Sequence, residues 1–501
     1  MKNLNNKIFI YSMGIFMFLL YVRFNGLIYD AISWDEATYM IAGRDLINGL
    51  IPYKDFLELK PPLVFFIYSI PALIDDNSFI IFRLYGYAYL FIASIILFLI
   101  IKKNQNLNLS LLLVFLFISL MNYHFWLWNS TELFSLPFIL LSYLFLLKKN
   151  FLLSGLMISL STLIRINYSF TVIFVVFYIL IKIYKKDYTF LNLYNFALGG
   201  LIPLFLFLIY FIHHDALLDF KISNFDIFIA YSGEHSLING IYNLFKALFK
   251  LNYFSWHIFL PFTILLFLTE FSNIKNNKVL QIYVLSIFLS IAASGHAYSH
   301  HIIQLIPFLI IFISNQDMNV NNYKNLIKKN LIYASIIITL IISSLNNFNL
   351  LKNNQNINKY HLHNRMIEKI NDINSKAKIL ALDYLIIPWK VKSPRIHKIT
   401  HTPSIFRNTT KSRLKPYIDN NIYKENYIDD IYLSNPDIII CSVRICEESR
   451  ENYDNNMISN LLSNYEEIYR EENVSRWEYT KKGSIIIYRS KIEPKTLKKF
   501  N

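Results

Sequence analysis

Charged residues are scarce in this 501-residue sequence: Asp, Glu, Lys and Arg make up 17% of it, whereas soluble globular chains carry about 25%. Glycine (12 residues), proline (14) and cysteine (2) are also scarce. With this composition, we exclude a disordered chain, a collagen, a coiled coil and a disulfide scaffold. Apolar residues are abundant, since 54% of the chain is hydrophobic and 17% aromatic. The composition is therefore typical of a polytopic α-helical membrane protein.

The charged residues are unevenly distributed along the chain. Residues 1–346 contain 39 of them, whereas the remaining 155 residues contain 44. The second density is that of an ordinary soluble domain. We therefore predict a transmembrane domain over 1–346 and a soluble domain over 347–501.

Eleven apolar runs are long enough, or nearly long enough, to cross a bilayer as helices. They lie at 8–28, 79–101, 107–122, 131–147, 151–164, 167–182, 191–213, 252–271, 279–293, 300–314 and 331–346. A shorter run at 62–74 begins with two prolines and predicts a helix at the interface or folded back into the protein. Arg165 interrupts the stretch 151–182, which favours two short helices meeting at that residue.

The lysine clusters test this topology. With eleven spans, all six clusters fall on one side, which the positive-inside rule makes cytoplasmic; they are Lys2 and Lys7, Lys102-Lys103, Lys148-Lys149, Lys182 with Lys185-Lys186, Lys275 with Lys278, and Lys324 with Lys328-Lys329. The N-terminus is then cytoplasmic and its run an uncleaved anchor. The loop 29–78 and the tail from 347 face the other side. The net charge of +15 thus reflects loops rather than a nucleic-acid surface.

The tail predicts a small extracytoplasmic α/β domain. Its strand-like runs lie at 378–384, 437–444 and 483–490, with a helical pattern at 455–464. Cys441 and Cys446 lie five residues apart. They are close enough in sequence to bridge across a turn, but we expect two free thiols.

The first outer loop, 29–78, is rich in chemically competent side chains. Asp35 and Glu36 follow the first span, and Lys60 precedes Pro61-Pro62. A carboxylate just outside a span can accept a proton from an acceptor hydroxyl. A lysine held before a Pro-Pro helix start can neutralise a phosphate. On composition alone, such a loop is also an ordinary polar connection.

An ordered set of short motifs resembles the integral-membrane GT-C glycosyltransferases, in the branch of protein O-mannosyltransferases and lipid A aminoarabinose transferases. The motifs are Trp34-Asp35-Glu36-Ala37, Lys60-Pro61-Pro62-Leu63, Phe82-Arg83-Leu84, Asn129-Ser130-Thr131-Glu132, His300-His301-Ile302-Ile303-Gln304-Leu305-Ile306-Pro307 and, in the tail, Asn435-Pro436-Asp437-Ile438-Ile439. Each motif is weak alone, but together they cover most of the chain in order.

The resemblance implies an inverting transfer of a hexose or pentose from a polyprenyl-phosphate carrier to an extracytoplasmic acceptor. Asp35 would be the catalytic base, Lys60 would contact the donor phosphate, and Glu36 would be a helper or a structural partner. The acceptor would be a glycolipid, an envelope polysaccharide or a protein, and the enzyme would lie in a bacterial inner membrane.

Further candidates have competing interpretations. Glu132 is either a second active-site carboxylate or a helix N-terminal charge. Arg165 either reaches the phosphate or pairs with a carboxylate. His300 and His301 stand where the family often has Arg, Lys or Tyr, which implies donor-phosphate contact. Arg83 is either a motif residue of structural importance or a residue that snorkels to the interface, and we expect the second.

We expect no metal cofactor, because no histidine group in the sequence has a spacing that predicts a site; the groups considered are His213-His214-Asp215 with His296, and His361-Leu362-His363. The alternative function is a transporter or flippase of lipid-linked glycans, which predicts inverted repeats that the sequence does not display. A scaffold that has lost activity is a third possibility, against which the presence of both Asp35 and Lys60 argues.

Overall fold

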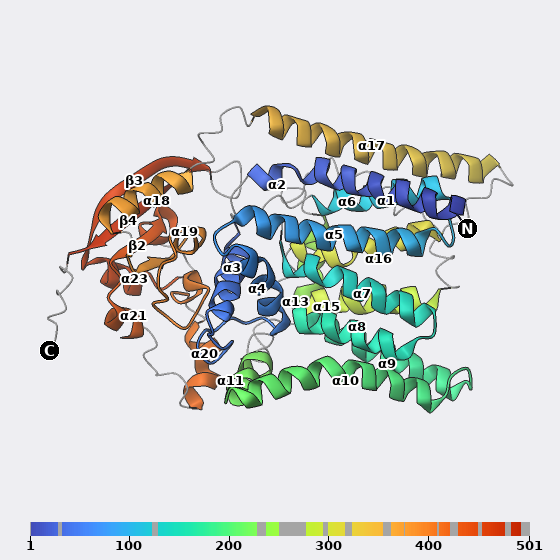
Figure 1. Ribbon diagram of the computed structural model, residues 1–501, viewed down its shortest axis with the longest axis horizontal. Helices are drawn as coiled ribbons and strands as arrows, with labels where there is room; N and C mark the ends of the chain where they lie inside the picture. The colour runs from blue at the N-terminus through green and yellow to red at the C-terminus, as the bar shows by residue number, and fades with distance from the viewer. Residues whose placement is uncertain are drawn as a thin grey trace.

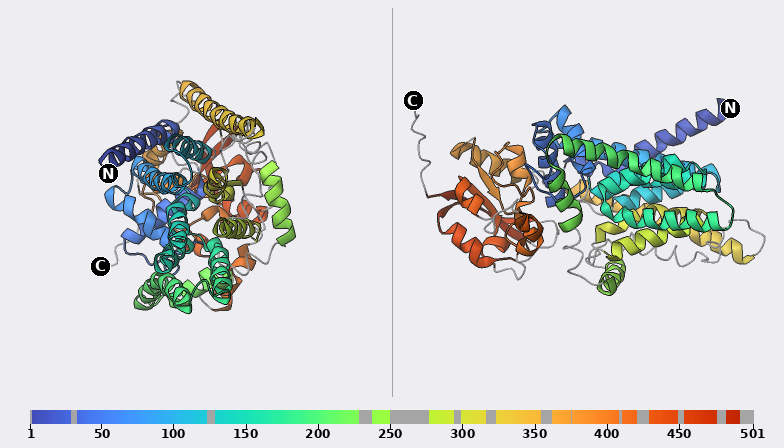
Figure 2. Two further views of the ribbon diagram at one scale, coloured as in Figure 1. Left: turned by 90° about the vertical axis from the view of Figure 1, so that its right-hand side faces the viewer. Right: turned by 90° about the horizontal axis from the view of Figure 1, so that it is seen from below.

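The computed structural model describes residues 2–28, 33–122, 129–227, 237–249, 277–293, 299–315, 323–353, 362–374, 376–407, 410–420, 429–448, 453–475 and 482–491. Most of these residues are helical, and a small sheet lies near the C-terminus. The helices lie side by side in a bundle, with the C-terminal sheet at one end and the N-terminus at the other (Figures 1 and 2).

The bundle consists of apolar helices with irregular segments between them. They are α1 (Lys2–Arg23), α2 (Asn25–Ile28), α5 (Phe79–Ile101), α6 (Leu107–Met121), α7 (Thr131–Leu147), α8 (Phe151–Ile164), η1 (Ile166–Tyr168), α9 (Ser169–Tyr184), α10 (Phe190–His213), α11 (Leu217–Lys221), η2 (Ile222–Asp226), α13 (Leu237–Phe249), α15 (Lys278–Ala293), η4 (Ser299–Gln304), α16 (Ile306–Ser314) and α17 (Tyr323–Asn353). Of the predicted runs, 252–271 lies outside the described residues, and 300–314 is a short 3₁₀ turn followed by α16.

Three helices of the described chain are long and apolar enough to cross a membrane alone: Phe79–Ile101, Ile166–Tyr184 and Phe190–His213. Seven more are apolar but shorter, with 10–17 residues. The outer face of α10 exposes large apolar side chains, among them Phe190, Leu201 and Phe205. Such a face suits contact with lipid rather than water. The chain is thus a helical protein with membrane-spanning character, while the predicted number of eleven spans remains a prediction.

The stretch 151–182 is broken as predicted. Helix α8 ends at Ile164, Arg165 has an extended backbone (φ −142°, ψ 111°), and η1 and α9 follow. Helix α8 packs closely on α10, since a Cβ on Gly155 would lie 2.0 Å from the backbone oxygen of Phe196. Only glycine permits this approach, which fixes α8 and the break that follows it.

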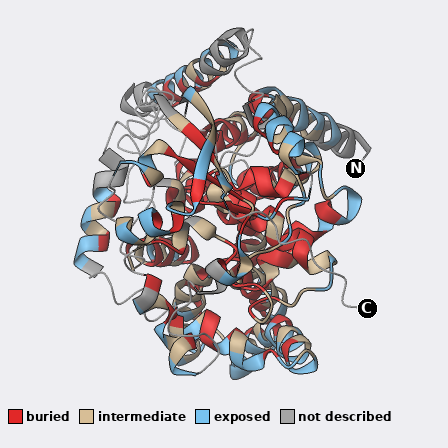
Figure 3. Cartoon of the chain, turned by 90° about the vertical axis from the view of Figure 1, so that its left-hand side faces the viewer, coloured by how far each residue is buried: buried red, intermediate tan, exposed pale blue. Residues whose placement is uncertain are grey.

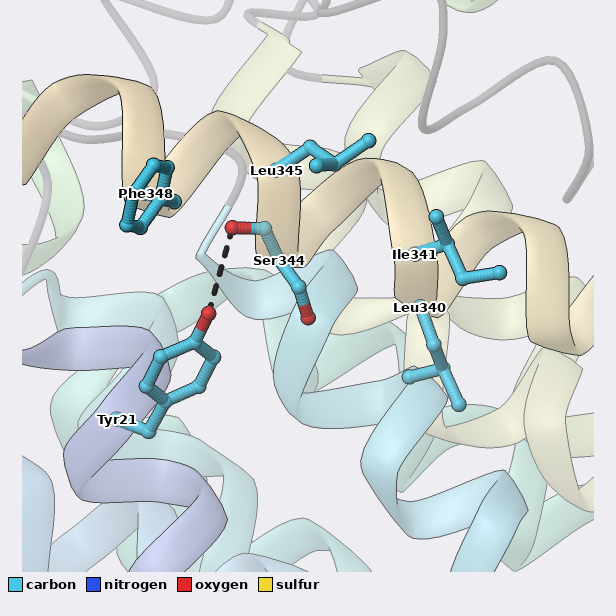
Figure 4. Close-up of a pocket in the computed structure, with 6 residues that line it drawn as sticks. All are labelled: Tyr21, Leu340, Ile341, Ser344, Leu345 and Phe348. Atoms are coloured by element: carbon cyan, nitrogen blue, oxygen red, sulfur yellow. Dashed lines mark hydrogen bonds between the residues drawn. The ribbon is translucent and has the colours of Figure 1, made fainter.

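A shallow apolar groove lies between α1 and α17 on the outside of the bundle (Figure 4). It is lined by Tyr21, Leu340, Ile341, Ser344, Leu345 and Phe348. The Tyr21 hydroxyl donates a hydrogen bond of 3.4 Å to the backbone oxygen of Ser344. None of the candidate site residues lines this groove.

The first outer loop contains two helices, α3 (Trp34–Ile47) and α4 (Leu63–Ile74). Helix α4 is the short helix predicted at 62–74, and it is too short to cross a bilayer. A buried cluster joins α3 and α4 to the start of α5 and to the C-terminal domain; Tyr39, Tyr68, Phe82, Trp389 and Ile438 belong to it. Seen from the C-terminal end, buried residues gather in the middle of the protein and exposed ones at its rim (Figure 3).

The C-terminal domain contains one four-stranded sheet in the order β1-β2-β4-β3. The strands are β1 (Ile379–Ala381), β2 (Ile438–Ser442), β3 (Tyr465–Ser475) and β4 (Lys482–Ser490); β1 and β2 are parallel, and the other pairs are antiparallel. The helices are α18 (Leu362–Ile373), α19 (Ile386–Lys390), η6 (Thr402–Ser404), α20 (Thr410–Asp419), α21 (Asp429–Ser434), α22 (Val443–Cys446) and α23 (Asn455–Leu462).

Two expectations about the tail need correction. Cys441 and Cys446 form a disulfide, so the prediction of two free thiols is wrong. Cys441 lies near the end of strand β2 and Cys446 ends the short helix α22, so the turn between them brings the two sulfurs together. In addition, α17 continues past the composition boundary at 346 as far as Asn353.

The C-terminal domain is anchored to the first outer loop by polar contacts. Arg44 donates to the Trp389 backbone oxygen (2.6 Å), and Arg395 forms an ion pair with Asp45. The loop and the domain also share a short parallel pairing, in which the Leu57 amide donates to the Lys398 oxygen (2.7 Å). These contacts hold the domain against the loop that carries Asp35 and Lys60.

Candidate active site

Asp35 lies in the first turn of α3, where the helix dipole favours a negative charge. Its side chain is 47% exposed, and its Oδ1 lies 3.9 Å from Nε2 of His401. The preceding Trp34 donates a 2.6 Å hydrogen bond from Nε1 to Asp383 of the C-terminal domain, which fixes the start of the helix. Asp35 is therefore an accessible carboxylate on a rigid support.

The neighbouring Glu36 is turned away from Asp35 into the protein. It forms an ion pair with Arg83 on α5, and the two side chains are 2% and 1% exposed. The sequence allows Glu36 to be either a helper or a structural partner, and the structure places it in a structural pair. The expectation that Arg83 snorkels is wrong, because its guanidinium is drawn inward by the Glu36 carboxylate.

Lys60 lies in the connection between α3 and α4, immediately before Pro61-Pro62. The Tyr53 hydroxyl donates a 2.6 Å hydrogen bond to the Lys60 backbone oxygen. Tyr53 is buried and has a positive φ of 69°. The Lys60 backbone is therefore held in place by a buried side chain, directly before the proline pair.

Glu132 and Arg165 form a buried ion pair at the mouth of the bundle. Their side chains are 2% and 7% exposed, and Arg165 also donates to Oγ1 of Thr131 (2.8 Å). The break at Arg165 aims its side chain at the first turn of α7. A close contact of α5 with the residues before α7 sets their position, since a Cβ on Gly86 would lie 1.9 Å from Oδ1 of Asn129.

His300 and His301 approach the same carboxylate from η4. Their Nε2 atoms lie 3.7 Å and 3.9 Å from Oε1 of Glu132. The two residues come from a segment far along the chain, so the fold brings together two of the predicted motifs, 129–132 and 300–307, with Arg165. Both rings lie beside the Glu132–Arg165 pair, with the His300 side chain 22% exposed and that of His301 11% exposed.

Electrostatic interactions connect Asp35 in the outer loop with the group around Glu132 in the bundle. Partial burial by itself raises the pKa of Asp35, but the positive charge of Lys60, with a smaller contribution from Arg165, acts against it, and the net pKa is lowered. Asp35 is therefore ionised at neutral pH. The pKa of Asp35 thus depends on charged groups of the outer loop and of the bundle, and its carboxylate also faces the C-terminal domain.

Glu58 is an acidic group of the site that sequence reasoning did not assign. Burial raises its pKa to about 7, assisted by the negative charge of Asp35 and opposed by Lys60. The residue lies in the first outer loop, but nothing in the sequence pattern distinguishes it from a solvated acid. Its environment, rather than its spacing, marks it as a titrating group near neutral pH.

His401 is the second residue that the sequence reasoning missed. Burial lowers the pKa of its ring to about 4, although Asp35 opposes this effect, so the ring is neutral at pH 7. Nδ1 lies 2.7 Å from the Ser404 hydroxyl oxygen, which leaves Nε2 facing Asp35. No signal in a single sequence pairs a residue of the tail with one in the first loop.

One group among the described residues has the geometry to hold a metal ion. The ligand atoms of Glu132, His300 and His301 all lie within 4.8 Å of one another. However, Oε1 of Glu132 also accepts a hydrogen bond from Arg165. A metal ion there would have to displace a guanidinium group or share its carboxylate, which the repulsion between two cations opposes.

Comparison with known proteins leaves the site to be judged on its geometry. No protein-family model matches the chain, and no curated protein matches it.

Proposed function

We propose that this protein is an inverting glycosyltransferase that takes a sugar from a polyprenyl-phosphate carrier and transfers it to an acceptor outside the cytoplasm. The observation that carries the proposal is the accessible carboxylate of Asp35, 3.9 Å from His401, together with the cluster of Arg165, His300 and His301 around Glu132. The positive charges of Lys60 and Arg165 both act on Asp35. Such a site offers a base for the acceptor and cations for a phosphate.

In the proposed reaction, the acceptor hydroxyl oxygen forms a bond to C1 of the sugar as the bond from C1 to the phosphate oxygen breaks. The hydroxyl proton passes to the carboxylate of Asp35, which is ionised at neutral pH and accessible. The polyprenyl phosphate leaves with its negative charge, so no acid is needed to protonate it. Cationic side chains near the leaving oxygen stabilise that charge.

Lys60 is the principal candidate for this stabilisation. Arg165 shares its charge with Glu132, whereas none of the ion pairs within the described part of the chain uses Lys60. Its ammonium group is therefore available to a phosphate. We assign Arg165, His300 and His301 to the donor side through their position around Glu132. The reaction so described needs no metal.

The geometry also supports a location for the site at the extracytoplasmic face of a bacterial inner membrane. The turns after α5, α7 and α9 lie at the end of the bundle away from the C-terminal sheet (Figure 1) and contain three of the lysine clusters. The positive-inside rule makes that end cytoplasmic. The disulfide in the C-terminal domain agrees with an oxidising compartment at the other end.

A gene deletion tests the proposal even while the identity of the sugar is unknown. Lipid extracts and envelope glycans of the deletion strain are compared by mass spectrometry with strains complemented by wild type, Asp35→Asn or Lys60→Ala. We expect a polyprenyl-phosphate monosaccharide to accumulate, and one sugar to be missing from a glycan, in the deletion and in Asp35→Asn. Lys60→Ala should weaken use of the donor.

Two outcomes of this experiment contradict the proposal. Accumulation of a complete lipid-linked oligosaccharide on the cytoplasmic side would favour a flippase, and normal product from Asp35→Asn would remove Asp35 as the base. Asp187→Asn is the matched control, because Asp187 forms only an exposed ion pair with Lys182, remote from the site.

A further inference from the structure

The C-terminal domain contacts the outer loop beside Asp35 through one short segment, residues 398–401. The Leu57 amide donates to the Lys398 oxygen (2.7 Å), and the Thr400 amide donates to the Leu57 oxygen (3.0 Å). These two bonds align residues 398–400 with the outer loop, between Asp35 and Lys60 in sequence. His401 follows directly, so the loop and the domain hold its backbone in a defined place.

Each nitrogen of the His401 ring faces a different polar group. Nδ1 lies 2.7 Å from the Ser404 hydroxyl, and the Ser404 amide donates to the His401 oxygen (2.9 Å), which closes a tight turn. The ring packs edge-on against Trp34, with centroids 5.7 Å apart. Nε2 is then left to face Oδ1 of Asp35 at 3.9 Å.

The spacing between His401 and Asp35 suits a third group between them. A distance of 3.9 Å is too long for a direct hydrogen bond, but one oxygen atom can lie about 2.8 Å from both groups. A neutral ring whose Nδ1 accepts from the Ser404 hydroxyl has a proton on Nε2 to donate. A hydroxyl oxygen placed there accepts from Nε2 and donates its own proton to the carboxylate.

We propose that His401 holds the acceptor hydroxyl against Asp35, so that the C-terminal domain supplies the acceptor side of the active site. This inference rests on the proposed glycosyltransferase function and adds the residue that recognises the acceptor hydroxyl. The acceptor presents a hydroxyl group, because it must accept one hydrogen bond and donate another, which an ammonium group cannot do. Ser404 acts as a positioning residue that keeps the proton on Nε2.

Other charges around the ring agree with a neutral donor. Burial is the largest influence on the pKa of His401 and disfavours protonation, as do the positive charges of Arg407 and Lys60, whereas Asp35 and a backbone hydrogen bond of His401 favour it. A simple ion pair of His401 with Asp35 would require the protonated ring that burial and these two cations oppose. A hydroxyl group bound between the two side chains fits the 3.9 Å distance and does not require protonation of the His401 ring.

The test measures acceptor and donor dependence separately with the purified full-length protein. The donor is the polyprenyl-phosphate lipid extract of the deletion strain. The acceptor is the envelope fraction of the same strain with its glycolipids retained and only the polyprenyl-phosphate lipids removed, and each is titrated at a fixed amount of the other. Variants are His401→Ala, His401→Gln and Ser404→Ala. His213→Gln is the control, because His213 is an exposed residue at the end of α10.

We expect His401→Ala to raise the half-saturating amount of acceptor by up to about tenfold, the upper end of what the loss of one hydrogen bond produces, and to leave that of donor unchanged. The amide of His401→Gln can donate in place of Nε2 and should restore part of the effect. Ser404→Ala should act in the same direction, but less strongly.

Unchanged acceptor dependence in His401→Ala overturns the inference and leaves the glycosyltransferase function intact. Equal changes in donor and acceptor dependence, with a lowered unfolding temperature, would show a merely structural residue and also overturn it. Ser404→Ala covers the case in which His401→Ala does not fold. Absence of transfer by the wild-type protein would overturn the proposed function itself.

Discussion

Asp35 and Glu36 are adjacent in the first turn of α3, yet their carboxylates have opposite environments: Asp35 is 47% exposed beside His401, and Glu36 is 2% exposed in an ion pair with Arg83. Residues next to one another on a helix point about 100° apart, which sends one side chain to the site and the other into the core. Asp35 is thus placed for a chemical role, whereas the adjacent Glu36 is placed to stabilise the fold.

This separation predicts different phenotypes for two conservative substitutions. Asp35→Asn should abolish transfer while leaving the unfolding temperature in detergent unchanged, because the side chain is accessible and the replacement is isosteric. Glu36→Gln should lower stability by about 3–5 kcal/mol, since it leaves the buried Arg83 without its counter-charge. Thermal unfolding and product analysis of the two purified variants provide the measurement. A destabilised Asp35→Asn or a fully stable Glu36→Gln would contradict this division.

Glu58 predicts a pH dependence of donor use. Its raised pKa of about 7 makes it neutral below that pH and negatively charged above it. The charged form partly cancels the positive charge of Lys60 and repels a phosphate, so binding of the donor should weaken as pH rises. From about pH 6 to about pH 8, the half-saturating amount of donor should rise about fivefold, which corresponds to about 1 kcal/mol.

The variant Glu58→Gln isolates this effect, because it cannot ionise. Its donor dependence should stay flat over the same pH range and resemble that of wild type at acid pH. Asp35, with its lowered pKa, stays charged and His401, with its pKa of about 4, stays neutral across the window, so neither contributes. A pH profile unchanged by the substitution would assign the titration to another group.

Three candidate residues could be picked from the sequence because each stands at the edge of, or at a break in, an apolar pattern. Arg165 interrupts a hydrophobic stretch, and the structure confirms that two helices meet there. Glu132 begins the apolar helix α7, and Lys60 precedes a proline pair. A charged side chain within or beside an apolar stretch is energetically costly unless it has a partner, so its position in the sequence already indicates a functional or paired residue.

The contribution of the C-terminal domain was not predictable in the same way. His401 meets Asp35 only because residues 398–400 pair with Leu57, and one sequence carries no signal of that pairing. Strand β3 (Tyr465–Ser475) was missed as well, because its polar, charged sequence is that of an edge strand rather than a buried one. The disulfide depends on a turn geometry that residue spacing does not reveal.

Packing between α8 and α10 predicts a stability effect at one glycine. A Cβ on Gly155 would lie 2.0 Å from the Phe196 backbone oxygen, whereas a Cβ on Gly14 would have no atom within 4 Å. Gly155→Ala should therefore force the helices apart and cost about 1–3 kcal/mol, and Gly14→Ala should not destabilise the protein. Thermal unfolding of both variants in the same detergent compares them directly. Equal stability of the two would argue against close packing of α8 on α10.

The ion pair between Arg165 and Glu132 predicts that transfer does not depend on a metal. The guanidinium already occupies the carboxylate oxygen that a cation between Glu132, His300 and His301 would use. Treatment of the purified protein with EDTA should therefore leave the rate of sugar transfer unchanged. Added Zn²⁺ should not raise that rate, and it should inhibit if it competes with Arg165. Loss of transfer in EDTA that Zn²⁺ or Mn²⁺ restores in wild type, but not in His300→Gln, would instead identify these three residues as a metal site and require Arg165 to move away from Glu132.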